Sequence, residues 1–523
     1  MIQSPDDAAL IADCIVRFGA NAVKPEYPLE PCCALTNHVV EEKTDSGIAV
    51  KKANSHLFNI FPPFFLLPLF RSRQKKEGTI LCRIVKEFIP NRLIGQFGIY
   101  HSDPSVSLVL TRGAEFDIIR AMKDTSQRKR IYEAVLDEHL RDNRQMAFLT
   151  GPRQCGKTTL AKTLADRYFT WDDLATRQLV AGDAAGLANA AGLDIASSRR
   201  TVITLDEIHK FVRWKSFLKG FFDLYEDRMR LIVTGSARLD IYKRGGDSLM
   251  GRYFLYHMHP FGVAELVRPE LEATEIHAPR PIEPEDWNAL WMHGGFPEPF
   301  VRRDMRFTHR WRKLRREQLF REDMRDLTKI ADIAGIRILS ELLLARAGNQ
   351  IVAASLAREI GIAEKTIKAW VATLEYFHEG FTVRPWFKNI ENSIRKTPKW
   401  YQRNWCEVAD EGARFENLVA CHLLKAVDMW NDLGLGDYAL YYVRNKAKAE
   451  VDFLVTKNGM PWFLAEAKTA DTKISPTLAA MQKATGAAHA FQVVRDLPYA
   501  GADTFSYREP IAVSAQSFLS QLF

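Results

Sequence analysis

The sequence predicts an α/β protein that contains a parallel β-sheet, and two observations carry this prediction. Between residues 146 and 266, short apolar runs alternate with helical patterns. A parallel sheet covered by helices on both faces has this alternation, because its strands are buried on both sides. Residues 400–500 show a second alternation of strand and helix patterns, so we expect a second αβ unit.

Length and composition restrict the class of protein. The chain has 523 residues, which is too long for a single hydrophobic core and suggests about three domains. Its net charge of +8 at pH 7 permits contact with nucleic acid but does not identify such a partner. The seven cysteines form no CxxC pair, which argues against a disulfide framework and for a reducing compartment. We therefore expect a cytoplasmic protein.

One apolar stretch, residues 57–70, reads LFNIFPPFFLLPLF. It is shorter than the roughly 20 residues that a membrane helix needs, and its prolines would break a helix. It also lies too far along the chain for the apolar region of a signal peptide. The sequence therefore predicts no membrane partner.

Residues 1–121 have weak periodicity, many prolines and no motif. A charged helical pattern begins at Met122 and runs directly into an apolar strand at residue 146. Two interpretations stay open. Met122 is the true start and the upstream stretch is a disordered or misassigned extension, or the stretch is a small variable domain.

The first αβ unit, residues 122–266, contains five expected strands: Met146–Thr150, Arg167–Trp171, Thr201–Leu205, Arg230–Thr234 and Tyr253–His257. The sequence GPRQCGKT follows the first strand and opens a helical pattern. Glycines in such a loop let the backbone N–H groups surround phosphates at a helix N-terminus. We therefore expect ATP to bind Gly151, Pro152, Arg153, Gln154, Cys155, Gly156, Lys157, Thr158 and Thr159.

Individual side chains of this unit have expected catalytic roles. Lys157 would reach the β- and γ-phosphates, and the hydroxyl of Thr158 would bind Mg²⁺. The strand TVITL ends in two acids. Asp206 would hold the Mg²⁺ through water, and Glu207 would orient or deprotonate the attacking water.

Two further positions have weaker signals. The strand LIVTGS ends in small hydroxyl residues, and Ser236 or Thr234 could report the γ-phosphate from the carboxyl end of the sheet. Arg252 could neutralise transition-state charge, either in cis or from a neighbouring subunit of a homo-oligomer. A plain turn and a surface arginine are the alternative interpretations.

These segments together resemble a known family. The sequences GPRQCGKTTLA, TVITLDEIHK, LIVTGSARLDI and SLMGRYFLYHMHPFGVAEL are similar to those of prokaryotic AAA-type (AAA_14) P-loop ATPases that carry a C-terminal DUF4143 domain. The resemblance runs from about Met122 to about residue 495. It implies an ATPase module similar to AAA+ proteins and leaves the role of the second half open.

After a linker and an arginine-rich helical region at 267–337, residues 338–390 have the pattern of a helix-turn-helix unit. Leu356 and Ile360 lie on one helix, Gly361 turns, and the next helix buries Ile367, Val371 and Leu374. Near the start of that helix, Lys365, Thr366 and Lys368 would be exposed where a recognition helix meets DNA. The resembled family carries a winged-helix-like segment here. A three-helix unit that makes no DNA contact is the alternative.

Residues 391–500 contain a second set of charged residues, and 501–523 are expected to form a C-terminal tail. Asp452 and Glu466 lie on two expected strands, Lys468 shares a face with Glu466, and Glu416 lies near the N-terminal end of an expected helix. Carboxylates on adjacent strands can share a divalent cation, and a lysine can activate water beside it. This arrangement resembles the PD-(D/E)xK, or restriction-endonuclease-like, fold.

Two functions follow from these expectations. In the first, an Mg²⁺-dependent ATPase controls a nuclease-like domain that acts on nucleic acid, with DNA expected rather than RNA. In the second, the ATPase is a switch whose C-terminal half binds a partner protein or DNA without cleavage. A nucleotide-binding scaffold with slow hydrolysis is a third interpretation.

Overall fold

The computed structural model of the chain describes residues 128–193, 199–235, 249–324, 332–387 and 397–523. All of them belong to the unit Ala121–Phe523. The expectations for residues 1–121 and for Ser236 therefore lie outside the described residues. Within the described part of the chain, no helix is both long and apolar enough to cross a membrane.

The first sheet has five parallel strands in the order β2-β3-β4-β1-β5. Their bounds are β1 Met146–Thr150, β2 Arg167–Thr170, β3 Thr201–Asp206, β4 Met229–Gly235 and β5 Tyr253–His257. The parallel sheet predicted from the alternating pattern is therefore confirmed, and each observed strand end lies within one residue of its expected position.

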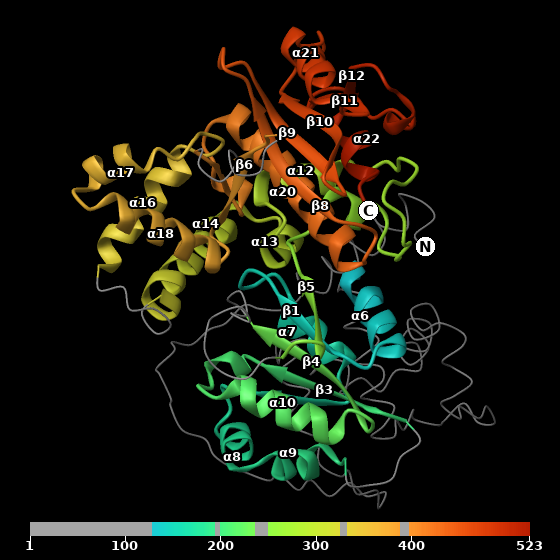
Figure 1. The fold of residues 1–523 in the computed structure, drawn as a ribbon, viewed down its shortest axis with the longest axis vertical. Coiled ribbons are helices and arrows are strands. Elements are labelled where there is room, and N and C mark those ends of the chain that lie inside the picture. The colour runs from blue at the N-terminus through green and yellow to red at the C-terminus, as the bar shows by residue number, and fades with distance from the viewer. Residues whose placement is uncertain (1–127, 194–198, 236–248, 325–331, 388–396) are drawn as a thin grey trace, which may run out of the picture. The chain divides into compact units, whose positions relative to one another are not determined.

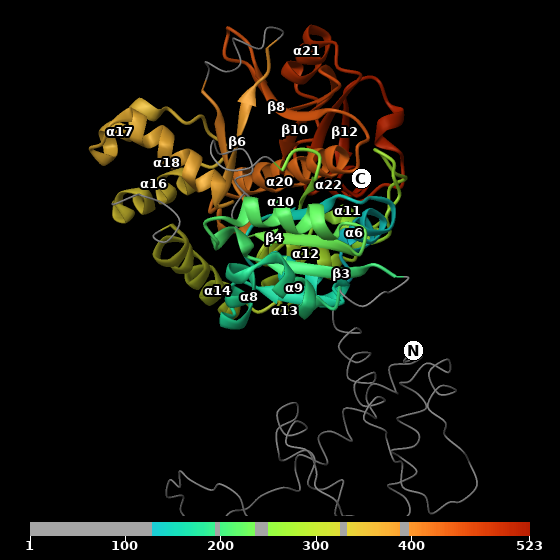
Figure 2. The ribbon, with the colours of Figure 1, turned by 60° about the horizontal axis from the view of Figure 1, so that its bottom comes forward.

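Helices cover both faces of this sheet. The side chains of β1 alternate between the two faces, and each set packs in its own hydrophobic cluster. Ala147 and Leu149 pack with residues of helices α6 and α7, whereas Met146 and Phe148 pack with residues of α9 and α10. Figure 2 shows α10 alongside β3 and β4. The bounds of the helices are α6 Ile131–Asp142, α7 Lys157–Leu164, α8 Leu174–Gly182, α9 Ala184–Ala191 and α10 Trp214–Tyr225.

The segment expected to be a linker and an arginine-rich helix is more helical than the sequence predicted. It contains α12 Pro284–His293, α13 Pro297–Arg302 and α14 Met305–Gln318, preceded by α11 Val263–Val267 and followed by the π-helical turn η3 Leu319–Asp323. Pro284 and Pro297 stand in the first turn of their helices, whereas Pro269, Pro279 and Pro281 lie in the connection between α11 and α12. Proline is well tolerated in a first turn, because the first N–H groups of a helix have no intrahelical partner.

Three helices follow: α16 Ile333–Ala345, α17 Ala353–Ile360 and α18 Glu364–Tyr376. Gly361 ends α17 with φ +80°, in the left-handed region that glycine adopts readily. Leu356, Ile367 and Leu374 are buried in the core of this unit, as the sequence predicted. Figures 1 and 2 both show the three helices grouped beside β6.

The second sheet has seven strands in the order β12-β11-β10-β9-β8-β6-β7, and it mixes parallel and antiparallel pairs. Helix α20, Glu411–Asp432, packs against β8 and β10 (Figure 1). The bounds of the remaining elements are β6 Gly380–Pro385, β7 Lys399–Gln402, β8 Tyr438–Arg444, β9 Glu450–Lys457, β10 Met460–Lys468, α21 Pro476–Thr485, β11 His489–Val494, β12 Ile511–Ser514 and α22 Ala515–Ser520.

Two of the expected boundaries need correction. Strand β6 falls in the segment assigned to the helix-turn-helix unit, yet it pairs with β7 and β8 of the second sheet. The expected tail, residues 501–523, is part of the fold, because β12 pairs with β11 and α22 buries Phe518 and Leu519. In both cases the pairing depends on contacts with another strand, and the periodicity within one segment carries no signal for such pairing.

One hydrophobic cluster joins the two sheets. Tyr256 at the end of β5 and Met258 and Phe261 after it belong to the same cluster as Leu418 and Leu423 of α20. Helix α20 is also in contact with β5. The half with the first sheet and the C-terminal half of the described chain therefore share a core.

Candidate functional site

The phosphate loop lies between β1 and α7 and depends on two glycines. Gly151 has φ +153°, and a Cβ atom there would collide with the carbonyl oxygen of Met258. Gly156 has φ +103° and stands immediately before α7. Neither conformation suits a residue with a side chain, so the glycine spacing of the motif follows from the path of the backbone.

Lys157 is buried, and its ammonium group lies within this loop. Its Nζ donates hydrogen bonds to the backbone oxygens of Gly151 and Pro152, both at 2.8 Å. The N-terminus of α7 adds partial positive charge at the same place. The loop therefore combines a cationic side chain with backbone N–H groups, which is the arrangement that binds phosphates in other P-loops.

The carboxylate of Asp206, at the end of β3, accepts hydrogen bonds from three hydroxyl groups. Thr158 Oγ1 donates to its Oδ2 at 3.0 Å, Tyr168 OH donates to the same oxygen, and Thr234 Oγ1 donates to Oδ1. Strand β4 lies between β1 and β3, so Thr234 near the end of β4 lies between the phosphate loop, which follows β1, and Asp206 at the end of β3. Thr158 and Asp206 supply the hydroxyl and carboxylate oxygens that a hard cation prefers, so the residues fit the expected Mg²⁺.

Glu207 follows directly and adopts φ +57°, a conformation that is uncommon for a residue with a side chain. Its backbone N–H donates to the backbone oxygen of Thr234 at 3.0 Å. Its carboxylate Oε2 lies 3.7 Å from both His209 Nε2 and Lys210 Nζ. The sequence predicted the acid pair but gave no role to the two basic neighbours.

The structure does not bring Arg252 to this site. Its guanidinium donates to the carboxylate of Asp223, at 2.7 and 2.9 Å, and its backbone oxygen accepts from the N–H of Met146. Met146 is the first residue of β1, whereas the phosphate loop follows the last residue of that strand. The two ends of a strand of this length are roughly 13 Å apart. The contacts of Arg252 therefore do not support its role in cis, and a role from a neighbouring subunit stays a prediction.

Arg130, at the N-terminus of α6, contacts the backbone of the phosphate loop. Its Nη1 donates to the backbone oxygen of Cys155 at 2.6 Å, and its Nη2 donates to that of His259 at 2.5 Å. Its Nε donates to Glu265 Oε1 at 2.7 Å. One buried guanidinium thus ties the loop to the segment that follows β5.

Glu265, on α11, is 1% exposed and binds a second cation. Lys425 Nζ, from α20, donates to its Oε2 at 2.5 Å and to the backbone oxygen of Pro260 at 2.9 Å. Burial would raise the pKa of Glu265, but the charges of Arg130 and Lys425 outweigh it and hold this pKa below its usual range. Arg130, Glu265 and Lys425 are called the buried triad below.

The same face of α20 makes three further polar contacts with the segment at and after β5. His422 Nε2 accepts from the N–H of Val263 at 3.1 Å. Asp428 binds His259 Nε2 at 2.8 Å, and Asp432 binds the N–H and Nδ1 of His257 at 2.6 and 2.9 Å. These contacts recur at about one helical turn, which fixes α20 against β5 along its length.

The charged residues expected in the C-terminal domain also come together. Glu416 near the start of α20 and Asp452 and Glu466 on the adjacent strands β9 and β10 interact electrostatically. Glu466 Oε1 binds Lys468 at 2.7 Å, as the shared face predicted. With Glu450 on β9, these three carboxylates form the acidic cluster discussed below.

Lys399, on β7, lies among the carboxylates of the acidic cluster, and no sequence motif predicted it there. Its side chain is 5% exposed, and its Nζ lies 3.1 Å from Glu416, 2.7 Å from Glu450 and 3.6 Å from Asp452. Burial lowers its pKa, but the carboxylates outweigh burial and raise it. Burial and the charge of Glu416 raise the pKa of Asp452 to about 7. The positive charge of one buried lysine therefore compensates part of the negative charge of the acidic cluster.

This arrangement does not fit the divalent cation that the sequence predicted here. Asp452 Oδ1 faces Lys399, and its Oδ2 accepts the N–H of Ala467 at 3.0 Å. Glu466 Oε2 is buried without a hydrogen-bond partner among the described residues. One free carboxylate oxygen is too few to hold a divalent cation, which takes several oxygen ligands. Nowhere in the described ranges do three or more His, Cys, Asp or Glu side chains form a group that could hold a metal ion. Lys399 supplies the positive charge instead.

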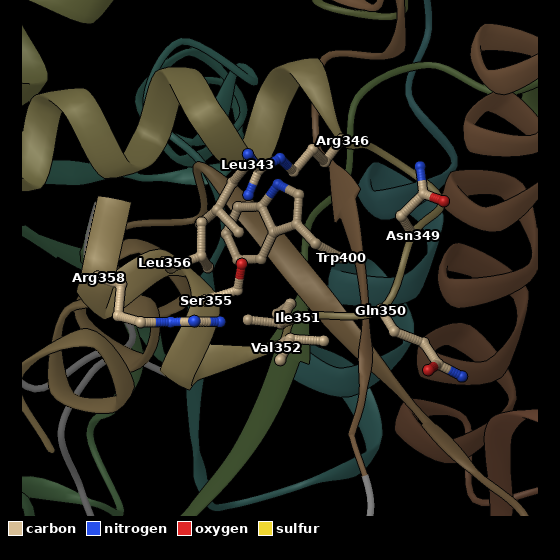
Figure 3. Close-up of a pocket in the computed structure, with 10 residues that line it drawn as sticks. All are labelled: Leu343, Arg346, Asn349, Gln350, Ile351, Val352, Ser355, Leu356, Arg358 and Trp400. Atoms are coloured by element: carbon tan, nitrogen blue, oxygen red, sulfur yellow. The ribbon is translucent and has the colours of Figure 1, made fainter. Parts of the chain in front are cut away.

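Strand β7 also forms one wall of a cavity of about 360 Å³. Lys399 and Tyr401 contact Glu416 on one side of the strand, and Trp400, which alternates with them, lines the cavity. Figure 3 shows Arg358 of α17 extending toward Ser355 and Ile351. The cavity is lined by Leu343, Arg346, Asn349, Gln350, Ile351, Val352, Ser355, Leu356, Arg358 and Trp400.

At the start of α18, Lys365 and Lys368 are exposed as the sequence predicted, whereas Thr366, also expected to be exposed, is half-buried. Lys368 forms an ion pair with Glu364 at 2.6 Å, within the same helix. The positive charge available to a nucleic acid here is therefore small. The recognition role of this helix stays a prediction.

Comparison with known proteins finds three family models that match successive parts of the chain. The model of a family described as an AAA domain matches residues 143–267, and that of the domain of unknown function DUF4143 matches 411–516. Another domain of unknown function, DUF8612, matches residues 284–405. The expected order of an AAA-type P-loop domain and a C-terminal DUF4143 domain is therefore confirmed.

Two mycobacterial proteins are similar to the chain. They are Uncharacterized protein Rv2008c of Mycobacterium tuberculosis (strain ATCC 25618 / H37Rv) and Uncharacterized protein Mb2031c of Mycobacterium bovis (strain ATCC BAA-935 / AF2122/97). Each is 26% identical over 347 residues, which are 64% of this chain and 72% of the relative. AMPPCP-bound DnaA from Aquifex aeolicus aligns with 46% of this chain and 86% of its own, at 14% identity and a TM-score of 0.23, too low to support an argument.

Proposed function

We propose that the chain is an Mg²⁺-dependent ATPase that works as a switch, in which the nucleotide state of the phosphate loop sets the state of the C-terminal half. The AAA domain match and the geometry of the loop support the nucleotide site. The buried triad supports the coupling.

Hydrolysis would use the residues around the loop. ATP would bind at residues 151–159, with Lys157 and the loop N–H groups on its phosphates. Thr158 and Asp206 would hold Mg²⁺, which neutralises charge on the phosphates. Glu207 would orient the attacking water and accept its proton, and Thr234, bonded to Asp206, would sense the change at the γ-phosphate.

One observation carries the coupling. Arg130 binds the backbone of Cys155, a residue of the phosphate loop, and Glu265 at the same time, and Glu265 binds Lys425 on α20. A buried ion pair tolerates little displacement of its partners, because an unpaired buried charge is strongly unfavourable. A movement of the loop would therefore move α20, whose start carries Glu416 of the acidic cluster.

The C-terminal half would bind its partner, a nucleic acid or a protein, without cutting it. Lys399 supports this choice, because it neutralises the acids that would otherwise attract a divalent cation. Cleavage of DNA is the second candidate function, and the convergence of Asp452, Glu466 and Lys468 favours it. These two functions predict different results with Mn²⁺.

Hydrogen exchange measured by mass spectrometry tests the coupling on the full chain. We expect ATP to change the exchange of α20 and of β9 in the Glu207→Gln variant, which holds ATP without hydrolysing it. Lys425→Met should abolish this change while nucleotide still binds, and Lys483→Met, at an exposed position of α21, should not. Unchanged exchange in α20 with ATP bound would refute the switch.

A second experiment identifies the partner. ATP turnover is measured with and without double-stranded DNA at increasing salt, with Lys157→Ala as the inactive control. Salt-sensitive stimulation supports DNA as the partner, and its absence favours a protein. Mn²⁺-dependent cutting that Asp452→Ala removes would replace the binding function with the nuclease.

A further inference from the structure

His209 lies beside the proposed water-positioning residue and has no assigned role. It belongs to the single turn η2, Ile208–Lys210, which begins directly after Glu207. Its side chain is 7% exposed. Both ring nitrogens are buried and have no hydrogen-bond partner among the described residues.

The ring faces the nucleotide site. Its Nε2 lies 3.7 Å from Glu207 Oε2, beyond hydrogen-bond distance but in electrostatic contact. After burial, which lowers the pKa of His209, the charges that act on the ring are those of Glu207, Lys210, Lys157 and Arg153. The imidazole is therefore close to both the acid and the phosphate loop.

The surrounding segment holds the ring in this place. Ile208 is buried in the core of the sheet, and Phe211 stacks on Trp171 with their ring centroids 5.0 Å apart. Lys210, the other neighbour of Glu207 Oε2, is bound to Asp172 at 2.7 Å. A buried polar group without a partner destabilises a protein. Such a group, held firmly within a nucleotide site, indicates a functional contact.

We propose that His209 is a positioning residue for Glu207. The proposal rests on the ATPase function proposed above. A ring nitrogen donates to Glu207 Oε2 once the two atoms approach by about 0.8 Å, to ordinary hydrogen-bond length. This bond fixes the carboxylate, so that its other oxygen accepts the proton of the attacking water. His209 itself touches neither the nucleotide nor the water.

Steady-state turnover and nucleotide affinity of the full chain test this role together. His209→Ala should lower kcat by about tenfold to hundredfold, the range for one hydrogen bond to a charged group. It should leave the Kd of a fluorescent ATP analogue unchanged. His209→Gln, which keeps an N–H donor, should recover most of kcat.

Two controls separate positioning from packing. His139→Ala removes another buried imidazole of the same domain, which binds Gln145 and Tyr256. It should lower the melting temperature at least as much as His209→Ala and leave kcat unchanged. In a Glu207→Gln background, His209→Ala should have no further effect on kcat, because both residues act in one step.

The outcomes are distinguishable from a failure of the proposed function. If wild type hydrolyses ATP and Lys157→Ala does not, while His209→Ala keeps the wild-type kcat, the role of His209 is refuted and the ATPase stands. A loss of kcat in His209→Ala that matches a loss of affinity, or that Gln does not rescue, also refutes positioning. If wild type neither binds nor hydrolyses ATP, both proposals fall.

Discussion

The guanidinium of Arg130 donates to the backbone oxygen of Cys155 at 2.6 Å, and Cys155 is a residue of the phosphate loop. The contact is buried and charge-assisted, which makes it stronger than a bond between neutral groups. Because Arg130 also binds Glu265, the shape of the loop depends on the segment after β5. One side chain thus contacts both the phosphate loop and Glu265, which in turn binds Lys425 of α20.

Lys157→Ala should weaken ATP binding by about hundredfold or more, because it removes the cation that contacts the phosphates. Isothermal titration calorimetry with ATP and Mg²⁺ measures the change. Lys162→Ala, which removes an exposed lysine from the same helix, is the matched control and should bind as wild type does. Retention of wild-type affinity in Lys157→Ala would contradict the placement of the phosphates.

Glu207→Gln should slow turnover by about 10²- to 10⁴-fold, the contribution of a positioned general base. ATP should still bind, because the phosphate contacts are untouched. A phosphate-release assay measures turnover, with Glu138→Gln on the exposed face of α6 as the control. Unchanged turnover would assign the base to another residue.

Glu265→Ala should lower the free energy of unfolding by about 3–5 kcal/mol, because it leaves Arg130 and Lys425 buried without their partner. Glu272→Ala, which removes a half-exposed acid, should cost about 1 kcal/mol or less. Urea unfolding compares the two. A small effect of Glu265→Ala would mean that the buried triad adds little to the fold.

The triple variant Arg130→Met, Glu265→Leu and Lys425→Met should regain most of that loss, because no charge remains buried alone. It should nevertheless lose the ATP-dependent change in the hydrogen exchange of α20. A triple variant that keeps this change would show that the hydrophobic contacts, and not the buried triad, couple the two halves.

Lys399→Met should create a divalent cation site, because it frees the carboxylates of Glu416, Glu450 and Asp452 from their internal cation. Mn²⁺ titration in a Lys157→Ala background, which disables the nucleotide site, should show binding that the Lys399-containing protein lacks. If the protein with Lys399 already binds Mn²⁺ through Asp452, the acidic cluster is a metal site after all.

Asp452→Asn should stabilise the protein at pH 8 and have less effect at pH 5. The pKa of Asp452 is raised to about 7 in the fold, so the folded state binds its proton more tightly than the unfolded state. Its contribution to stability is fully present below its usual pKa and is lost as the pH rises through about 7. Melting temperatures at both pH values measure the difference. An equal effect at pH 5 and pH 8 would contradict the raised pKa.

The sequence was most informative where structure is local. The five strands of the first sheet are apolar runs with polar ends, and the acids after β3 follow such a run directly, so their positions could be read from the pattern alone. Asp452, Glu466 and Lys468 were also recognisable, because strand alternation places Glu466 and Lys468 on one face.

Non-local contacts escaped this reasoning. Lys399 and Arg130 are single charged residues without a motif, and their partners lie on other elements. A weak signal existed for Lys425, which interrupts the apolar run VACHLLKAV at a position facing the helix core. A lysine in such a position requires a buried anion, but nothing in the sequence identifies Glu265 as that anion.

The close approach of Gly151 to the carbonyl group of Met258 has a consequence for dissecting the chain. The residues directly after β5 pack against the phosphate loop. The strand pattern alone would assign these residues to a connection between elements. A fragment ending at residue 257 would leave the back of its own phosphate loop open to water. A separately expressed ATPase fragment should therefore extend through α11 and include a substitute for α20.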